Sequence, residues 1–371
     1  MAHHKFIHDK TDSSVANCFF SLLTPAASEA YDNSRFPPFD TAIEGRGFQD
    51  ISIHPNEEEW LISECSKVIT NFPSCHLFIY SLKDKTYRRL NLSRAYSYIN
   101  GKFSPNGKQI LAVRQPPPKS NHYDEVLKSY AQGEIFIMNR DGSDFRVLPI
   151  PANRIMNPVM SPDGTKIAYL IAESDKPYVS SVSFAYFEIW EYDLMSGENR
   201  LFAGPMRFYH ATMINYLSDS EIIAGALAPE FTGEGQSRDY LGKYQGSEVF
   251  KIKRQMRFAP EPSFYDLPFA RYPSTDIRGN VFFEAQPEKI GFSLVMRTAT
   301  GSTKIWRAPQ KNFCVASKYI SAASGNYVAF IYGGDSLTSA EGKRALGYFD
   351  VQNETWHSIS PPKINQDLLH K

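Results

Sequence analysis

Two histidines stand close to acidic or aromatic residues in stretches that connect predicted strands. His122 is followed by a tyrosine and two acidic residues, and His210 follows two aromatic residues. An imidazole that titrates near neutral pH beside a carboxylate is the pair that general acid–base catalysis uses. The candidate catalytic groups are therefore His122, His210, Asp124 and Glu173. The simpler interpretation, two surface histidines without a role in chemistry, stays open.

Motifs for metal-dependent, phosphate-dependent or redox chemistry are absent from the sequence. It contains no HExxH or CxxC pair, no Asp-x-Asp-x-Asp calcium loop, no GxGxxG or GxxxxGK[ST] loop and no Gly-x-Ser-x-Gly nucleophile elbow. His3, His4 and His8 gather near the N-terminus, where we interpret them as an accidental weak metal binder. We therefore predict no metal site and no cofactor.

The charges of the chain balance, because 40 Lys and Arg stand against 40 Asp and Glu among 371 residues. Binding to nucleic acid or to an anionic membrane through bulk charge needs an excess of basic residues. The one basic run, residues 251–257, falls on a predicted hairpin, and we expect it to be solvated. No window reaches the roughly 18 consecutive apolar residues of a membrane-spanning helix. We therefore predict neither a nucleic-acid partner nor a membrane.

The four cysteines, at positions 18, 65, 75 and 314, are too few and too scattered for a disulfide scaffold. Cys65 and Cys75 flank one short loop and could face each other, but we expect free thiols there. The N-terminus is polar and lacks the apolar stretch of a secretory signal. These features favour a cytoplasmic protein, secreted only if a leader is missing from this sequence.

The sequence repeats a motif centred on a turn six times. FSPNGKQILAV (103–113) and MSPDGTKIAYL (160–170) are near copies, and looser versions begin at residues 53, 217, 275 and 321. In the two clear copies the proline fixes φ at the first turn position, and the glycine supplies the positive φ that closes the turn. An alternating strand, a polar turn and another strand follow each copy, as in GEIFIMNRDGSDFRVLPI (133–150). Each unit therefore has four strands.

Four-stranded antiparallel units cannot bury their faces alone and must pack on one another. With no convincing helix between them, the sequence predicts an all-β fold, a closed six-bladed β-propeller. We expect an N-terminal extension at 1–44, which supplies a closing strand around 18–23, and a C-terminal tail at 363–371. The expected blades are 45–99, 100–156, 157–211, 212–270, 271–313 and 314–362.

The turn motif, followed by EIFIMNRDG, resembles the blade repeat of TolB-like propellers, also called WD40-like or PD40 repeats. The resemblance is sharp over residues 100–210 and fainter elsewhere. It implies a six-bladed propeller, and similar blades occur in prolyl-oligopeptidase relatives and in oligogalacturonate lyases. We expect neither the N-terminal domain of TolB nor the hydrolase domain of oligopeptidases in this chain. The resemblance therefore identifies a fold, and neither activity is carried over.

In a propeller, the turns between strands a and b and between strands c and d share one face, and the b–c loops share the other. Here the b–c loops of blades 2, 3 and 4 are long, at residues 114–132, 173–186 and 226–246. Long loops on a rigid scaffold collect binding residues. We therefore expect a ligand site on this long-loop face, at the mouth of the axial channel. Its loop residues are Tyr123, Tyr178, Arg238 and Tyr240.

Aligning the turn motifs also places one residue of each innermost strand at an equivalent position. This axial ring consists of Asp50, Asn100, Asn157, Ile214, Tyr272 and Lys318. Most of its members are polar, so one interpretation is a hydrogen-bonding funnel for a polar ligand. A water-filled channel with a polar rim and no ligand is the other.

Two functions from different classes fit these features. The first is a monomeric binding module that engages a protein or peptide partner through the aromatic and charged long-loop face. The second is a cofactor-free lyase, isomerase, cyclase or hydrolase that acts on a small polar molecule or a sugar in the axial funnel. The balanced charge, the absence of a catalytic motif and the aromatic loops favour the binding module.

Overall fold

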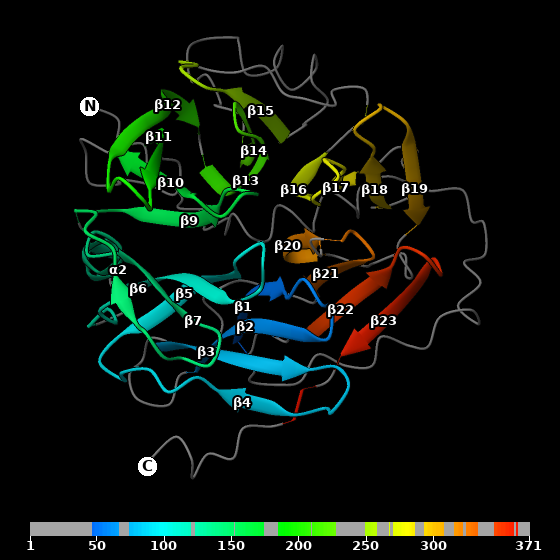
Figure 1. Ribbon diagram of the computed structural model, residues 1–371, viewed down its shortest axis with the longest axis horizontal. Helices are drawn as coiled ribbons and strands as arrows, with labels where there is room; N and C mark the ends of the chain where they lie inside the picture. The colour runs from blue at the N-terminus through cyan, green and yellow to red at the C-terminus, as the bar shows by residue number, and fades with distance from the viewer. Residues whose placement is uncertain are drawn as a thin grey trace, which may run out of the picture.

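The computed structural model describes residues 47–66, 74–119, 123–151, 153–173, 185–208, 210–227, 249–257, 267, 270–285, 293–307, 315–321, 324–332, 345–359 and 361–362. Six antiparallel sheets lie around one axis, each built from strands that are consecutive in the sequence (Figure 1). The prediction of an all-β, six-bladed propeller is confirmed.

The first three sheets have four strands each. Blade 1 consists of β1 (Gly47–Ile53), β2 (Glu59–Ser66), β3 (Ser74–Ser81) and β4 (Tyr87–Arg89). Blade 2 consists of β5 (Ser97–Phe103), β6 (Gln109–Gln115), β7 (Glu134–Asn139) and β8 (Arg146–Val147). Blade 3 consists of β9 (Ile155–Met160), β10 (Lys166–Glu173), β11 (Ala185–Asp193) and β12 (Asn199–Phe208).

The remaining sheets continue the same order. Blade 4 has three described strands, β13 (His210–Ser218), β14 (Glu221–Leu227) and β15 (Val249–Lys253). Blade 5 consists of β16 (Arg271–Thr275), β17 (Val281–Ala285), β18 (Ser293–Arg297) and β19 (Thr303–Arg307). Blade 6 consists of β20 (Val315–Ser321), β21 (Tyr327–Tyr332), β22 (Ala345–Asp350) and β23 (Thr355–Ile359).

One element departs from the expectation of an all-strand chain. The b–c connection of blade 2 contains the helix α2 (Tyr123–Tyr130). Eight residues are too few to show a clear helical period in the sequence, and so short a helix depends on the scaffold that holds it. No helix in the described part of the chain is long and apolar enough to cross a membrane.

The innermost strands close the ring by contact. Each of them, β1, β5, β9, β13, β16 and β20, contacts the innermost strand of the next blade, and β1 also contacts β20 and β21 of the last blade. All four strands of blade 6 come from residues 315–359. The closing strand expected around residues 18–23 lies outside the described residues.

The hydrophobic core is divided among the interfaces between blades. Six buried clusters are found in the described chain, one for each pair of neighbouring blades. The interface between blades 1 and 6 is built like the others, with Trp60 fully buried against the ring of Tyr348. Burying a large apolar side chain contributes roughly 1.5–3 kcal/mol. Apolar packing of this kind joins the first blade to the last.

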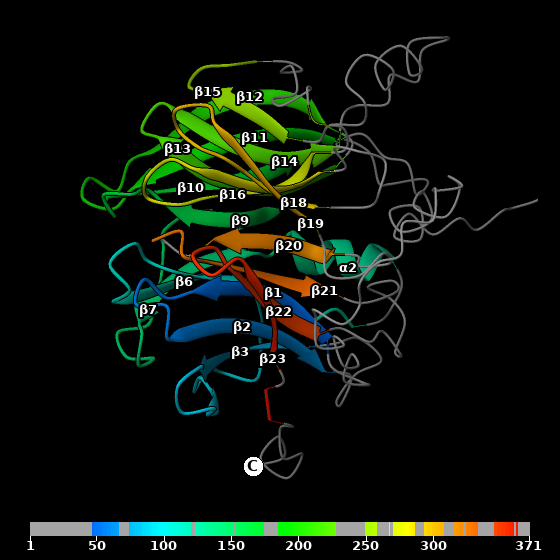
Figure 2. The same ribbon diagram turned by 90° about the vertical axis from the view of Figure 1, so that its right-hand side faces the viewer.

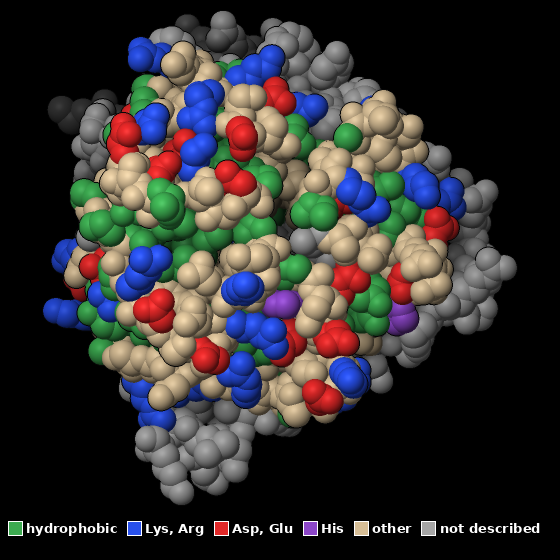
Figure 3. Space-filling model, viewed as in Figure 1, with side chains coloured by type: hydrophobic (Ala, Val, Ile, Leu, Met, Phe, Trp, Pro, Cys, Tyr) green, Lys and Arg blue, Asp and Glu red, His purple; other side chains and the backbone are tan. Residues whose placement is uncertain are grey.

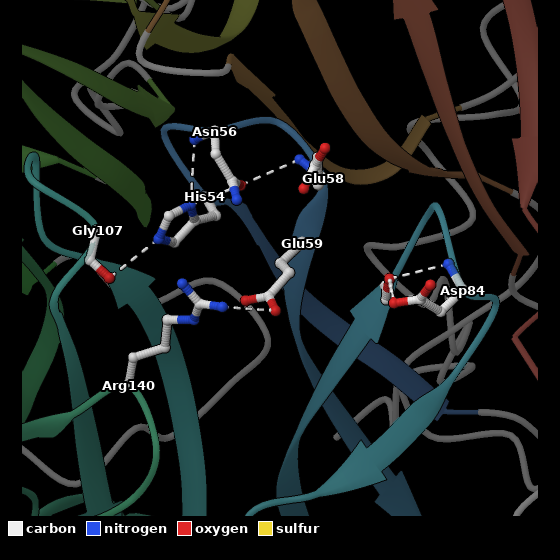
Figure 4. Close-up of polar contacts among 8 residues, drawn as sticks. His54, Asn56, Glu58, Glu59, Asp84, Gly107 and Arg140 are labelled. Atoms are coloured by element: carbon white, nitrogen blue, oxygen red, sulfur yellow. Dashed lines mark hydrogen bonds and ion pairs between the residues drawn. The ribbon is translucent and has the colours of Figure 1, made fainter.

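The short turns lie on the face opposite α2, as Figure 2 shows from the side. Gly107 and Gly164 close their turns with positive φ values of 71° and 74°, as the motif predicts. Gly107 has a second constraint, because its carbonyl lies 3.0 Å from Nε2 of His54 on blade 1 (Figure 4). A Cβ added at Gly107 would overlap the His54 ring. This turn therefore joins blade 1 to blade 2 as well as reversing the chain.

An ion pair between a buried carboxylate and a partly exposed arginine joins blades 3 and 4. Arg254 donates to both carboxylate oxygens of Glu191, at 3.0 and 3.1 Å, and its guanidinium lies 4.4 Å from the centre of the Phe202 ring. Glu191 also accepts the hydroxyl of Tyr216 at 2.9 Å and is 5% exposed. The expectation that the basic run 251–257 is a solvated hairpin is wrong for Arg254. The sequence could not show its acceptor, because Glu191 lies 63 residues away.

Replacing Arg254 tests this ion pair. We expect Arg254→Ala to lower the free energy of unfolding by about 2 kcal/mol, because the Glu191 carboxylate loses its bidentate partner while it stays buried. The matched control is Arg257→Ala, at an exposed position of the same basic run, which should change it by less than about 0.5 kcal/mol. Urea unfolding measures both variants. If both variants lost the same free energy of unfolding, the pair of Arg254 with Glu191 would contribute nothing to stability.

Candidate functional site

Three members of the predicted axial ring form one chain of hydrogen bonds. Asp50 accepts the backbone N–H of Asn100 at 2.9 Å and its side-chain amide at 3.3 Å. Asn100 in turn accepts the backbone N–H of Asn157 at 3.1 Å. All three are at most 9% exposed. The structure thus brings together the ring positions of blades 1, 2 and 3, and the side chains of Asp50 and Asn100 each bind the next blade.

The backbone explains why asparagine recurs in this ring. Asn100 and Asn157 have φ values of 55° and 49°, and Tyr272 on blade 5 has 54°. Each lies where the pairing of the two inner strands shifts register. Asparagine tolerates the left-handed region better than most residues with a side chain. The bulge also turns the freed backbone N–H toward the preceding blade in blades 2 and 3.

A lysine bridges the axis nearer the short-turn face. Lys102 reaches from blade 2 to blade 4, where Nζ lies 3.5 Å from the carbonyl oxygen of Ile214 and 3.4 Å from Oδ1 of Asn215. Asn215 donates to the carbonyl oxygen of Pro273 on blade 5 at 3.1 Å. These residues connect three blades across the axis. The sequence analysis placed Ile214 in the ring. It missed the role of Lys102, because Lys102 and Ile214 are 112 residues apart in the sequence.

The helix α2 lies on the long-loop face of the propeller (Figure 2). Ser129 anchors it by donating to the carbonyl oxygen of Pro116 at 2.5 Å. Tyr130 keeps 37% of its surface exposed, yet burial of its hydroxyl end and the nearby Asp50 carboxylate both raise its pKa. The helix therefore connects the blade 2 insertion to the axial ring.

The backbone brings three candidate catalytic residues to the same end of the propeller. Asp124 is in α2, Glu173 is the last residue of β10, and His210 is the first residue of β13. Their side chains, and those of Tyr123 and Lys318, are not among the described ones. Four further candidates lie outside the described residues: His122, Tyr178, Arg238 and Tyr240.

Cys75 corrects one expectation from the sequence. It is disulfide-bonded, so the prediction of a free thiol at this position is wrong. Its Cα partner across the β2–β3 pair is Cys65. Residues directly opposite in an antiparallel pair have Cα atoms about 4.5–5.5 Å apart, within the range that a disulfide needs. Among the described residues, no group of three or more His, Cys, Asp and Glu could hold a metal ion.

Sequence reasoning missed a cluster of basic residues at the long-loop ends of blades 1 and 2. His76 accepts a hydrogen bond at Nδ1 from Arg89 at 3.2 Å, and burial together with Arg89 and Arg94 lowers its pKa to about 4. Arg89 has a lowered pKa because of burial and the like charge of Arg94. In blade 2, Arg114 on β6 is the Cα partner of Tyr98 on β5. No spacing in the sequence marks these residues, since they come from four separate elements.

The Asn100 position can be tested with a pair of variants. Asn100→Gly removes the side-chain bonds to Asp50 and Asn157 but keeps the positive φ accessible, and we expect a loss of about 1–3 kcal/mol in the free energy of unfolding. Asn100→Ala should lose about 1 kcal/mol more, because alanine disfavours that φ. Thermal and urea unfolding give the order. If the Asn100→Ala variant were as stable as the unchanged protein, the hydrogen bonds of the Asn100 side chain would not contribute to stability.

His76 gives a prediction of pH dependence. Its pKa is about 4 in the folded protein and 6.5 in the unfolded chain, so below pH 6.5 the unfolded chain takes up a proton that the folded protein does not. This stabilisation is fully present above pH 6.5 and is lost as the pH falls toward 4. Between pH 7 and 5 the loss should be about 2 kcal/mol. His76→Gln should remove this part of the pH dependence of unfolding, and an unchanged profile would contradict it.

No family model matches the chain, and no curated protein matches it in sequence. Solved structures do match. Oligogalacturonate lyase from Vibrio parahaemolyticus is 10% identical with a TM-score of 0.51, over 88% of this chain and 80% of that one. Acylaminoacyl peptidase from Pyrococcus horikoshii is 12% identical with a TM-score of 0.51, over 90% of this chain and 48% of the peptidase.

TolB from Acinetobacter baumannii also matches, at 13% identity and a TM-score of 0.49, over 86% of this chain and 65% of that one. At such identities, the likeness of the lyase and the peptidase shows the fold alone. The chain has the six-bladed β-propeller fold that its resemblance to TolB-like propellers implied.

Proposed function

We propose that this chain is a binding module that engages a protein or peptide partner through its long-loop face. One observation carries the proposal: the polar side chains of the axial ring in blades 1 and 2 bind the next blade. The Asp50 carboxylate accepts two donors of Asn100, and Asn100 accepts Asn157. A ring that holds blades together forms a rigid frame, and rigid frames present loops for recognition.

Acid–base chemistry would require a different use of these groups. A catalytic pair needs titratable side chains within hydrogen-bond reach of each other and of the substrate. Asp50 is the one carboxylate among the described ring residues, and it accepts the backbone and side-chain amide groups of Asn100 in the next blade. The contacts around the axis are thus those of a scaffold.

The helix α2 is a described part of the proposed surface. Its C-terminal turn is fixed by Ser129, while Lys128 is 68% exposed and pairs with Glu125 at 2.6 Å. Tyr130 exposes more than a third of its surface beside them. Tyrosine is enriched at the centre of protein interfaces, and charged residues form their rims. A fixed helix with these side chains suits a protein or peptide partner.

The short-turn face serves as the comparison surface. Figure 3 shows that face, where positive and negative side chains are interspersed. Its turns are held by short local hydrogen bonds, such as the 2.8 Å bond from Gly107 N–H to the carbonyl oxygen of Ser104. It therefore supplies control positions that are exposed and well separated from α2.

A cofactor-free enzyme is the second candidate, because the backbone brings Asp124, Glu173 and His210 to the long-loop end. It would act on a small polar molecule or a sugar. The lyase and the peptidase above show that this fold also serves enzymes. The fold by itself therefore does not separate the two candidates.

Paired surface variants test the proposal. The purified chain, immobilised through its C-terminus, captures partners from lysate, and the captured proteins are quantified by mass spectrometry. We expect Lys128→Glu with Tyr130→Ala to reduce the capture of specific partners about tenfold, as loss of an interface centre does. The control, Lys83→Glu with Met195→Ala on the short-turn face, should leave capture unchanged.

Two results would overturn the proposal. Equal loss in the control pair would show that the long-loop face is not the interface. Turnover of a sugar or another small polar compound that disappears in His210→Ala, while capture stays at background, would favour the enzyme.

A further inference from the structure

The turn between β1 and β2 departs from its counterparts in the other blades. Two residues before the second strand, four other blades carry a glycine with a positive φ: Gly107, Gly164, Gly279 and Gly325. Blade 1 has Glu57 at this position, with a φ of 63°. A residue with a Cβ is strained in the left-handed region, so the turn by itself favours glycine. The geometry of the turn therefore does not account for a glutamate here.

The Glu57 carboxylate lies at the interface between blades 1 and 6. Its Oε2 accepts the side-chain amide of Asn326, on the β20–β21 turn, at 3.2 Å. Its Oε1 is buried and has no hydrogen-bond partner in the described chain. A buried carboxylate oxygen without a donor costs free energy. One residue thus combines backbone strain with an unused acceptor, and such features gather at functional sites.

Aromatic side chains gather at the same end of this interface. Tyr327 follows Asn326 in the chain, and the centre of its ring lies 5.1 Å from that of Tyr348 on β22, with 68° between the ring planes. The centre of the Trp60 ring lies 5.5 Å from that of Tyr348. Tyr327 and Tyr348 are both partly exposed. The faces of aromatic rings attract cations, so this group of rings can contribute to a cation site.

The negative charge at this end is not matched by a cation of the protein. Asp350 is the Cα partner of Tyr327 and is 8% exposed, and its oxygens accept backbone and amide donors of its own turn. Neither Asp350 nor Glu57 has an ion pair in the described chain. Burial raises the pKa of Tyr327, and both carboxylates add to this shift. The rings therefore lie in negative surroundings.

The neighbouring turn of blade 1 does not supply the cation either. Leu82 donates its backbone N–H to the carbonyl oxygen of Glu58 at 2.8 Å, which places the β3–β4 turn beside the β1–β2 turn. Lys83 in that turn is exposed and makes no ion pair in the described chain. On this face, acidic side chains lie beside a hydrophobic patch in the region of β21 and β22 (Figure 3). The charge of Glu57 is thus left to a ligand.

The unused groups favour one kind of cation. A primary ammonium group carries three N–H donors on a positive charge. It can therefore donate to Oε1 of Glu57 and to the hydroxyls of Tyr327 and Tyr348, which make no hydrogen bond in the described chain. A quaternary ammonium group has no such donor. A divalent metal ion needs several oxygen ligands, whereas Glu57 offers one unused oxygen.

We propose that the short-turn end of the interface between blades 1 and 6 binds a primary ammonium group, with Oε1 of Glu57 as the charged acceptor and the rings of Tyr327 and Tyr348 beside it. Glu57 is partly exposed, so a change of its rotamer brings Oε1 to the surface. The inference goes beyond the proposed function, because the site takes a small cationic group on the face opposite α2.

The test titrates the full chain with n-butylammonium chloride and follows the indole N–H signal of Trp60 by NMR, with sodium chloride at equal concentration as the reference. The Trp60→Phe variant identifies that signal. We expect Glu57→Gln to weaken binding about tenfold, since it removes the charge but keeps an acceptor for Asn326. Glu58→Gln is the matched control at the next, exposed position, and it should change binding less than about twofold. Tyr327→Leu should weaken binding about threefold.

The Glu57→Gly variant separates binding from folding. It places in blade 1 the glycine that four other blades have, so the melting temperature should not fall, while n-butylammonium binding should weaken about tenfold. Unchanged n-butylammonium binding in Glu57→Gly would overturn the proposal. An equal loss of binding in Glu58→Gln and Glu57→Gln would also overturn it, because bulk charge alone would then explain the binding.

Related compounds test the chemistry of the ligand. The neutral analogue 1-pentanol should bind at least about tenfold more weakly than n-butylammonium. Tetramethylammonium that bound as tightly would show that the N–H donors are not used, and it would overturn the assignment to a primary ammonium group. Equal binding of Nα-acetyl-lysine-N-methylamide would indicate that lysine side chains reach the site, and weaker binding would indicate a free small amine. Partner capture through the long-loop face does not depend on these results, so the two proposals fail separately.

Discussion

Contact between blades is the interaction on which this structure depends. Backbone hydrogen bonds join the strands within each sheet, and no ladder runs from one sheet to the next in the described chain. Side chains therefore supply most of the contacts between blades, with backbone hydrogen bonds added between β12 and the turn after β15. Each of the six interfaces has its own apolar cluster, and the interface between the first and last blades is built like the rest. Closure of the ring needs every one of these contacts.

The same constraint explains where the buried polar groups lie. Asp50 and Asn100 satisfy backbone N–H groups that the bulges of the next blade leave without a ladder partner. Glu191 and Arg254 join blades 3 and 4, and Lys102 crosses the axis to blade 4. A buried polar group costs free energy unless it is hydrogen-bonded, so each of these also fixes the relative position of its blades.

A frame held in this way leaves recognition to its edges and loops. The helix α2 stands on the long-loop face, fixed by Ser129 and close to Asp50 through Tyr130. The arginines at the ends of blades 1 and 2 lie at the same end of the molecule. Under the proposed function, the scaffold and the binding surface use different residues. The proposed binding role follows from the use of the ring as scaffold.

Much of the fold can be predicted from the sequence, because the repeat is local. A proline and a glycine at fixed positions determine the turns around Gly107 and Gly164, and apolar alternation determines the strands that follow. The equivalence of Asp50, Asn100 and Asn157 also follows from the aligned turns. The helix α2 could not be predicted, because a helix of eight residues depends on its anchorage to the scaffold.

The use of the polar residues was decided by the tertiary structure. Whether Asp50 faces a ligand or a neighbouring blade depends on a residue 50 positions away, and the partner of Arg254 lies 63 positions away. Burial, Arg89 and Arg94 lower the pKa of His76, and none of these causes can be read from its neighbours in the sequence. Turns and strands are set by neighbouring residues in the chain. Charge, burial and hydrogen-bond partners are set by residues that the fold brings together, and these decide where this protein can recognise another molecule.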